Sequence, residues 1–251
     1  MILRAAANSD TGLCRAANED CYAAVPELGL YLVADGMGGH RAGQVASRLA
    51  AEAAVNALKT LQGAAASLTE KLRYAVAAAN REVFATAQAK PELTGMGTTL
   101  VALLACGERI ALAHVGDSRA YLIRGGKIRQ LTDDHSLVAE LVRRREISES
   151  AAREHPHRHV LTRALGVRGG VEADLAELTP AARDVFVLCS DGLTGHLRDQ
   201  EIAEVAADEA DLERACRCLV DLANARGGED NITVLVVRCE EAEGWQEVAQ
   251  G

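Results

Sequence analysis

Aromatic residues are scarce in this sequence. Phe, Trp and Tyr make up 3% of its 251 residues, although 49% of the chain is hydrophobic. A chain of this length can bury a sizeable core, as one large domain or two small ones. With so few aromatic rings, that core must consist mainly of Ala, Val, Leu and Ile side chains.

Positive charge is also in deficit. The 27 Lys and Arg residues are outnumbered by 36 Asp and Glu residues, and the formal net charge is −9. Proteins that bind nucleic acids or anionic membranes gain much of their affinity by neutralising phosphates with Lys and Arg. We therefore expect no general binding to nucleic acids or membranes. The local basic cluster Arg143–Arg145 is better explained as a solvated helix face.

Long apolar runs and paired cysteine motifs are missing as well. No segment reaches the roughly 18 uninterrupted apolar residues of a membrane span, and residues 1–8 do not have the pattern of a signal peptide. The seven Cys are an odd number, and the Cys and His residues do not cluster in pairs as they do in zinc sites. This pattern predicts a reduced cytoplasmic protein with free thiols.

Two helices are predicted in the first third of the chain. In the first, over residues 43–61, helical spacing predicts an inward face of Val45, Leu49, Ala53, Ala57 and Leu61. The second opens with a capping-box pattern at Ser67–Glu70. Its predicted inward residues are Leu68, Leu72, Val76, Ala79 and Val83, and Pro91 ends any continuation.

The middle of the chain is rich in predicted strands. Apolar runs at 98–105 and 109–115 are joined by a short link, and Gly125-Gly126 between the runs 119–124 and 127–131 is a strong hairpin signal. Links this short require antiparallel pairing. Two later strands are predicted at 184–190 and 232–239. Between them we expect two helices, one capped near Asp199 and one over residues 211–225.

Paired helices and antiparallel strand groups predict a layered α+β domain in which helices cover a sheet or sandwich. The sequence has no linker, repeat or low-complexity tract, so we expect one domain over residues 1–240 and a tail at 241–251. Residues 133–166 are polar and rich in His and Arg, and they contain two short helical patterns. We interpret them as an insertion that lies over the main body.

Four Asp residues stand at the end or start of an apolar strand with glycine nearby: Asp35, Asp117, Asp191 and Asp230. For any one of them a plain turn is the better explanation, because turns favour Asp and Gly. If the strands form one sandwich, however, the four carboxylates gather at one rim and repel one another. A bound cation would relieve this repulsion.

The ligand chemistry of these acids indicates which cation to expect. Sites made only of oxygen ligands favour Mg²⁺ or Mn²⁺ over zinc or copper. Several carboxylates, one of them able to bridge, indicate two ions roughly 3.5–4 Å apart, an arrangement suited to water attack on a phosphorus centre. Arg15 fits as a guanidinium that holds phosphate, with a surface salt bridge as the equal alternative.

Six short motifs occur in an order that resembles a known family. They are Arg15–Asp20, Ala34–His40, Gly97–Thr99, Gly116–Arg119, Ser190–Leu193 and Asp230–Thr233. Together they resemble the metal-dependent Ser/Thr protein phosphatases of the 2C type, the PPM family, in their compact bacterial form. The resemblance covers about residues 4–238, and the ordered set is far more specific than any single motif.

The resemblance implies a fold and a central metal site. The fold would be a four-layer αββα sandwich of two antiparallel sheets flanked by paired helices, with a helical flap at about 133–166. Asp35 would bridge two ions, Mn²⁺ or Mg²⁺, and the carbonyl oxygen of Gly36 would bind one of them. Asp191 and Asp230 would hold the other ion.

The resemblance also implies roles around this centre. Asp117, together with Asp191, would hold a third and weaker ion. Glu19 and Asp20 would act mostly through metal-bound waters, and Arg15 would bind the substrate phosphate. The implied reaction is direct hydrolysis of phosphoserine or phosphothreonine in proteins by a metal-bridged water, without a phosphoenzyme.

Family behaviour further implies phosphorylated proteins as substrates, a cognate Ser/Thr kinase whose action is reversed in bacterial signalling, and a monomer. The alternative is a catalytically weak regulator of the same fold that binds phosphoproteins or a kinase. Such a regulator would be expected to lose metal-binding Asp residues, and none is missing here. A structural calcium protein is disfavoured because the sequence has no EF-hand loop.

Two features leave alternatives open. Met37 stands where animal relatives often carry a histidine thought to protonate the leaving group, and a thioether cannot donate a proton. His40 or a metal-bound water is the candidate donor, and packing at a helix start explains His40 equally well. In the flap, Arg143–Arg145 and His155–His159 form either a basic surface for acidic phosphopeptides or, as we favour, a solvated helix and loop.

Overall fold

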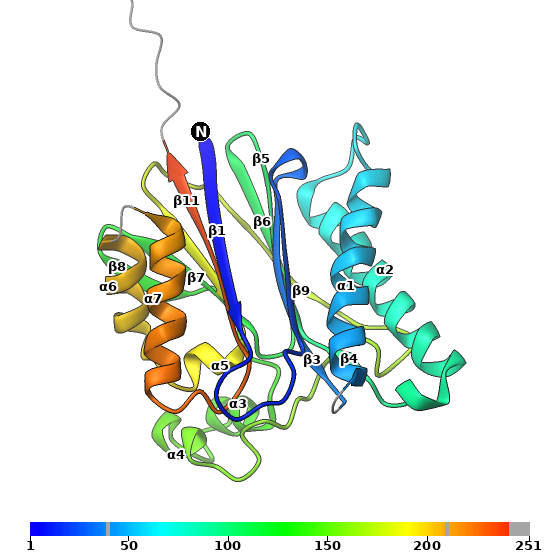
Figure 1. Cartoon of the computed structure of the whole chain (residues 1–251). Helices are drawn as coiled ribbons and strands as arrows, with labels where there is room; N and C mark the ends of the chain where they lie inside the picture. The colour runs from blue at the N-terminus through cyan, green and yellow to red at the C-terminus, as the bar shows by residue number, and fades with distance from the viewer. Residues whose placement is uncertain (39–40, 209–210, 241–251) are drawn as a thin grey trace, which may run out of the picture.

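A computed structural model describes residues 1–38, 41–208 and 211–240. It has four layers, with two antiparallel sheets packed face to face and a pair of helices on each outer side (Figure 1). This confirms the predicted α+β sandwich of two sheets flanked by paired helices. The predicted tail at 241–251 lies outside the described residues.

The first sheet has the strand order β1-β11-β10-β7-β8. Its strands are β1 (Ile2–Asp10), β11 (Ile232–Glu240), β10 (Val185–Cys189), β7 (Arg119–Arg124) and β8 (Lys127–Gln130). The second has the order β2-β3-β5-β6-β9, and β4 pairs with β3 outside this path. Its strands are β2 (Asp20–Val25), β3 (Leu30–Met37), β4 (Gly97–Thr98), β5 (Leu100–Cys106), β6 (Arg109–Val115) and β9 (Asp174–Leu178).

The sequence analysis missed three strands, and all three lie at a sheet edge: β1, β2 and β9. Edge strands remain half exposed, and these three consist mostly of exposed and partly buried residues. Polar residues interrupt β1 and β9 and weaken their apolar signal, whereas the apolar run at 21–25 in β2 was not recognised as a strand. The central strands were predicted to within a residue or two because both of their faces are buried.

Alternation along the central strands builds three separate core layers. Along β3, Leu30, Leu32 and Ala34 pack under the helices, whereas Tyr31 and Val33 point between the sheets. β11 alternates in the same way between the outer helices and the sheet interface. This period of two is what a strand covered on both faces requires.

One helix pair covers each sheet: α1 (Arg41–Thr60) with α2 (Leu68–Ala89), and α6 (Asp199–Asp208) with α7 (Leu212–Ala225). The predicted inward face of α1 was shifted by about one position. Small side chains at Ala46, Ala50 and Ala54 face the sheet, and Val45 and Leu49 are only partly buried at the flank. Alanines let the helix axis approach the sheet closely, which apolar spacing alone does not reveal.

One of the two predicted helix caps is confirmed and the other is wrong. Ser67 and Glu70 form the reciprocal capping box of α2. Asp211, predicted as the first residue of a helix, instead caps α7 through its carboxylate. Asp199, in contrast, is the first residue of α6 rather than its cap. Its carboxylate accepts a hydrogen bond from the hydroxyl of Tyr121.

The segment 133–166 contains two short helices, α3 (Leu137–Arg143) and α4 (Glu149–Arg153), at the end of the sandwich where α5 (Asp191–Thr194) also lies (Figure 1). The remaining short elements are the 3-10 helices η1 (Pro26–Leu28) and η2 (Pro91–Leu93). All seven Cys are unpaired, and Cys216 is buried. Within the described ranges, no helix is both long enough and apolar enough for a membrane span.

Candidate metal centre

Asp35 lies near the end of β3, and strand pairing places a second acid beside it. Asp20 is the register partner of Asp35 in the β2–β3 ladder. The next residue, Gly36, donates its N–H to the carbonyl oxygen of Glu19 at 3.1 Å. The predicted ligands Asp35 and Gly36 and the predicted outer acids Glu19 and Asp20 are therefore brought together by one pair of strands.

The main chain around Asp35 is held by two threonines. Its N–H donates to Thr99 Oγ1 at 2.9 Å, and its carbonyl oxygen accepts from Thr98 Oγ1 and from the Thr99 N–H, each at 2.8 Å. Thr99 Oγ1 also lies 2.6 Å from Ser118 Oγ, beside Asp117. The sequence analysis noted these threonines as a motif but assigned them no role.

Asp191 and Asp230 come to the same end of the molecule through the other sheet. Asp191 follows β10 and Asp230 precedes β11, and these strands are antiparallel neighbours. A Cβ on Gly192 would lie 2.0 Å from the carbonyl oxygen of Asn231, so the two turns are in close contact and glycine is required there. The sandwich thus brings together acids that are distant in the sequence.

Asn231, which sequence reasoning did not assign, ties the first acids to the last. Its Oδ1 accepts from the Glu19 N–H at 2.7 Å, and its Nδ2 donates to the carbonyl oxygens of Thr11 and Ala17. The loop that carries Arg15 and Glu19 is therefore fastened directly beside Asp230. Its only sequence signal was the adjacency of Asn231 to Asp230.

Burial and mutual repulsion raise the pKa values of acids in this cluster. Burial, followed by the charges of Asp20, Asp191, Asp117 and Asp230, raises the pKa of Asp35 well above its ordinary value. Burial and the charge of Asp191 likewise raise the pKa of Asp117. The four strand-end acids therefore gather at one rim as predicted, and Asp20 joins them as a fifth carboxylate.

The carboxyl group of Asp20 is buried, and only part of it is satisfied by hydrogen bonds. Burial, opposed by hydrogen bonds from Thr233 and Ser190, raises the pKa of Asp20 to about 7. Ser190 Oγ donates to Asp20 Oδ2 at 2.7 Å, but Oδ1 is buried without a hydrogen-bond partner among the described residues. A buried, unsatisfied carboxylate oxygen is costly unless water or a cation occupies the space beside it.

Glu19 and Gly36 are brought together by a glycine at the start of α1. A Cβ on Gly43 would lie 1.9 Å from Glu19 Oε2 and 2.8 Å from the carbonyl oxygen of Gly36. Both oxygens therefore lie on the same side of Gly43, and any larger residue would displace them. Taken together, the cluster offers only oxygen ligands and excess negative charge, and it fits hard divalent ions such as Mn²⁺ or Mg²⁺.

Arg15 brings a positive charge to the rim formed by these acids. Its Nη2 lies 2.6 Å from Asp230 Oδ2, and its side chain is 52% exposed. Burial lowers the pKa of the guanidinium, but the charges of Asp230, Glu19 and Asp191 outweigh this and raise it. A half-exposed guanidinium beside a carboxylate cluster is available to a phosphate that approaches from solvent.

The flap also reaches the cluster. His159 Nδ1 lies 3.5 Å from Asp191 Oδ2, and this contact raises the pKa of His159. Arg158 lies 3.7 Å from Glu229, the neighbour of Asp230. The sequence analysis named His155–His159 only as part of a basic surface and did not predict this contact.

Other sequence-predicted residues have partners outside the cluster of acids or lie outside the described part of the chain. Arg143 Nη1 donates to the carbonyl oxygen of Asp134, and Arg144 pairs with Glu140 one turn away, so these arginines have local partners at the end of α3. His40 lies outside the described residues. A cavity of about 410 Å³ lies at the opposite end of β3, lined by Leu28, Leu58 and Leu104 among others, and none of the acids lines it.

A family model for protein phosphatase 2C matches residues 4–232 of this sequence. The chain belongs to the protein phosphatase 2C family. The serine/threonine phosphatase stp of Listeria monocytogenes is 42% identical over 234 residues, which cover 91% of this chain and 93% of that protein. The phosphatase PstP of Mycobacterium tuberculosis is 44% identical over 94% of this chain, which matches 45% of the longer protein.

Solved structures of this phosphatase family have the same fold. The M. tuberculosis PstP crystal structure superposes with a TM-score of 0.88 at 41% identity, and the match covers 96% of this chain and 100% of that one. The catalytic domain of PstP in complex with two manganese ions gives a TM-score of 0.85 at 40% identity, over 96% of this chain and 99% of that one.

Proposed function

We propose that this 2C-family chain is a metal-dependent phosphatase that hydrolyses phosphoserine and phosphothreonine in proteins. The observation that carries the proposal is the convergence of the carboxylates of Asp20, Asp35, Asp117, Asp191 and Asp230, whose charges act on one another at one end of the sandwich. Membership of the 2C family and the manganese-bound PstP structure support it.

Two divalent ions would be held by Asp35, the Gly36 carbonyl oxygen, Asp191 and Asp230, with Glu19 and Asp20 around them. A third, weaker ion would be held by Asp117 together with Asp191. When bound, such ions lower the pKa of a shared water and offset charge on the phosphoryl oxygens. Mn²⁺ and Mg²⁺ both suit this set of ligands.

The residues of the chain have separate tasks in this mechanism. Thr98 and Thr99 fix the main chain of Asp35, so that its carboxylate stays in place as charge changes around it. Arg15, already held by Asp230, binds the phosphate and orients it toward the acids. Preorganised charge of this kind supplies most of the catalytic effect in phosphoryl transfer.

The finer biological setting is also part of the proposal. We propose that the chain acts as a cytoplasmic monomer that reverses a Ser/Thr kinase in bacterial signalling. The relatives named as Ser/Thr phosphatases in Listeria and Mycobacterium support this setting. The flap segment 133–166, whose His159 contacts Asp191, is proposed to contribute to substrate selection.

The test is phosphate release from a phosphothreonine peptide with Mn²⁺, together with calorimetric titration of Mn²⁺. We expect turnover with Mn²⁺, loss of turnover with EDTA, and loss in Asp35→Asn. Asp221→Asn, an exposed acid on α7, is the matched control and should behave as the wild type. Metal binding without turnover would instead identify a regulator that binds phosphoproteins.

A further inference from the structure

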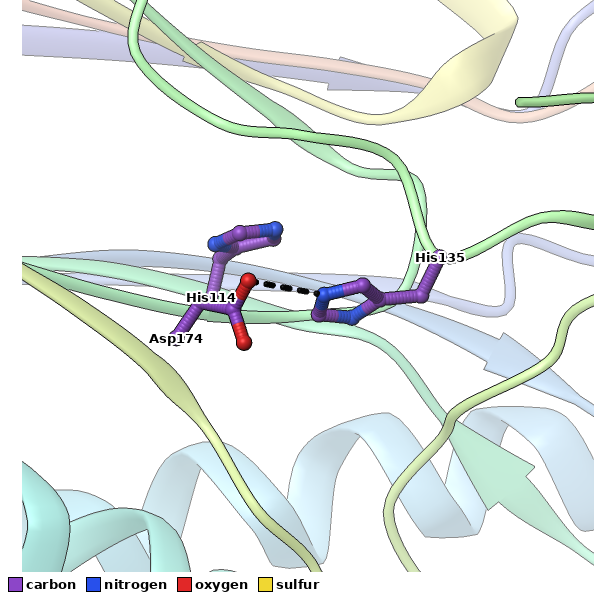
Figure 2. A group of neighbouring side chains, drawn as sticks. All are labelled: His114, His135 and Asp174. Carbon is purple, nitrogen blue, oxygen red and sulfur yellow. Dashed lines mark ion pairs between the residues drawn. The ribbon is translucent and has the colours of Figure 1, made fainter. Parts of the chain in front are cut away.

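A second polar cluster lies between the flap and the sandwich (Figure 2). His114 on β6, His135 at the start of the flap and Asp174 on β9 place one ligand atom each within 4.8 Å of one another. Both histidines are 4% exposed, and their rings stack with centroids 4.5 Å apart. Two histidines and an aspartate also form common zinc sites, so the hydrogen bonds of the rings must decide what this cluster does.

Those hydrogen bonds fix the proton on His135. The N–H of Gly116 donates to His135 Nδ1 at 3.1 Å, so Nδ1 is unprotonated and the neutral ring carries its proton on Nε2. Nε2 faces Asp174 Oδ2 at 3.3 Å (Figure 2), although no well-aligned hydrogen bond forms there within the described part of the chain. A protonated Nε2 cannot bind a metal, so this cluster is not a zinc site.

The same residue holds Gly116 from both sides. The N–H of His135 donates to the carbonyl oxygen of Gly116 at 2.9 Å, while Nδ1 accepts from the Gly116 N–H. The carbonyl oxygen of His135 accepts from the N–H of Thr162 at 2.8 Å. This bond joins the segment that leads into the flap to the segment that leads out of it. His135 therefore connects the base of the flap to the turn that carries Asp117.

Gly116 is packed tightly against Thr99 and has a backbone conformation that favours glycine. Its φ is +109°, and a Cβ would lie 2.6 Å from Thr99 Cγ2. Thr99 in turn holds the main chain of Asp35. A displacement of the Gly116 turn would therefore move Asp117 directly and disturb Asp35 through Thr99.

We propose that His135 is a positioning residue, whose Nδ1 and main chain hold the Gly116–Asp117 turn and so set the affinity of Asp117 for a divalent ion. The part that concerns the ion rests on the proposed function, in which Asp117 is a metal ligand. The part that concerns the turn rests on the hydrogen bonds alone.

Two substitutions separate the arms of the imidazole. In His135→Asn, Oδ1 takes the place of Nδ1 and keeps an acceptor for Gly116, whereas the contact with Asp174 is lost. In His135→Gln, the terminal amide reaches the Nε2 position but leaves the Gly116 N–H without its acceptor. We expect Gly116 amide exchange in the metal-free chain to accelerate about tenfold in His135→Gln and to change less than twofold in His135→Asn, since loss of one buried acceptor has that scale.

Calorimetry with Mn²⁺ tests the consequence for metal binding. We expect His135→Gln to weaken the weakest Mn²⁺ binding step about tenfold, His135→Asn to leave it within twofold, and Asp117→Asn to abolish it. If Asp117→Asn leaves that step unchanged, the assignment of Asp117 as a ligand fails while the exchange result still judges the turn. If Asp117→Asn abolishes the step but His135→Gln does not weaken it, the inference about His135 is overturned.

Wild-type protein provides a check that needs no folded variant. Long-range ¹H–¹⁵N correlation spectra distinguish histidine tautomers, and we expect the Nε2–H form for His135. Observation of the Nδ1–H form would overturn the proposal. That form would mean that Nδ1 does not accept from Gly116.

Discussion

The two ends of β10 carry acids with opposite surroundings. Asp184 precedes the strand, and its side chain is 1% exposed; Arg124 donates to both of its carboxylate oxygens, at 2.8 and 2.6 Å. Asp191 follows the strand and lies among other carboxylates, which include Asp20 and Asp35. The same strand thus ends in a completed ion pair on one side and in surplus negative charge on the other.

We interpret this difference as a division between acids that stabilise the fold and acids that bind the proposed metal ions. A buried carboxylate that the fold itself requires is matched by a cation of the chain, as at Asp184. Carboxylates crowded without enough cations destabilise the protein unless an ion from outside completes them. Substitutions of the acids and arginines in each region test whether this division holds.

The largest effect is expected when the surplus charge is reduced. Asp35→Asn keeps the shape of the side chain but removes a proposed metal ligand, so we expect kcat to fall by about 10³-fold or more, as for other central catalytic groups. Asp184→Asn should leave kcat within about twofold and lower the free energy of unfolding by about 1–3 kcal/mol, because it weakens a charged hydrogen-bond pair. Phosphopeptide turnover and urea unfolding measure the two quantities. Similar kinetic losses in both variants would contradict the division.

The two arginines should show the reverse pattern to each other. Arg15→Ala removes the proposed phosphate contact, and we expect kcat/KM to fall about 10- to 100-fold, the range of a charge-assisted hydrogen bond. Its ion pair with Asp230 is half exposed, so stability should change by less than about 0.5 kcal/mol. Arg124→Ala should instead lower stability by about 1–3 kcal/mol and spare kcat/KM. An Arg15→Ala enzyme with unchanged kcat/KM would remove Arg15 from the substrate site.

The positions of the acids at strand ends could be predicted from the sequence, but the residues that hold them in place could not. Asp35, Asp117, Asp191 and Asp230 were predictable because strand ends marked by Asp and Gly are a local pattern. The bond from Ser190 to Asp20 joins residues 170 positions apart, and no local pattern encodes such a pair. Support from Asn231 and Thr99 has the same long-range character.

The elements of the fold also differed in how well the sequence predicted them. The strands β6 and β7 were predicted with their observed bounds, since burial on both faces leaves a strong apolar signal. The edge strand β1, with its partly buried alternation, left none. On α1, the choice between a face of Val45 and Leu49 and one of Ala46 and Ala50 depends on how closely the helix approaches the sheet. That distance is set by tertiary packing, which outweighs local preference.

Protonation gives a smaller and graded test of the surplus charge. Burial raises the pKa of Asp20 from 3.8 to about 7 in the folded chain. The fold therefore favours the protonated acid, and the resulting stability is complete below about pH 4 and is lost as pH rises through 7. We expect the Tm of the metal-free protein to fall between pH 5 and pH 8 and the fall to be shallower in Asp20→Asn. Calorimetric scans in EDTA measure this; equal slopes in the two proteins would contradict it.

The smallest effect is expected at charges that have partners or face solvent. Arg143 and Arg144 already contact Asp134 and Glu140, and all three arginines at the end of α3 are exposed or partly exposed. Replacement of Arg143–Arg145 with Ala should raise KM for an acidic phosphoprotein by about two- to fivefold, since exposed charges act mainly by steering. Turnover of p-nitrophenyl phosphate should not change, because that substrate has no acidic peptide segment for these arginines to attract. An equal loss with both substrates would place these arginines in the chemistry of the acid rim rather than on a surface that guides substrates.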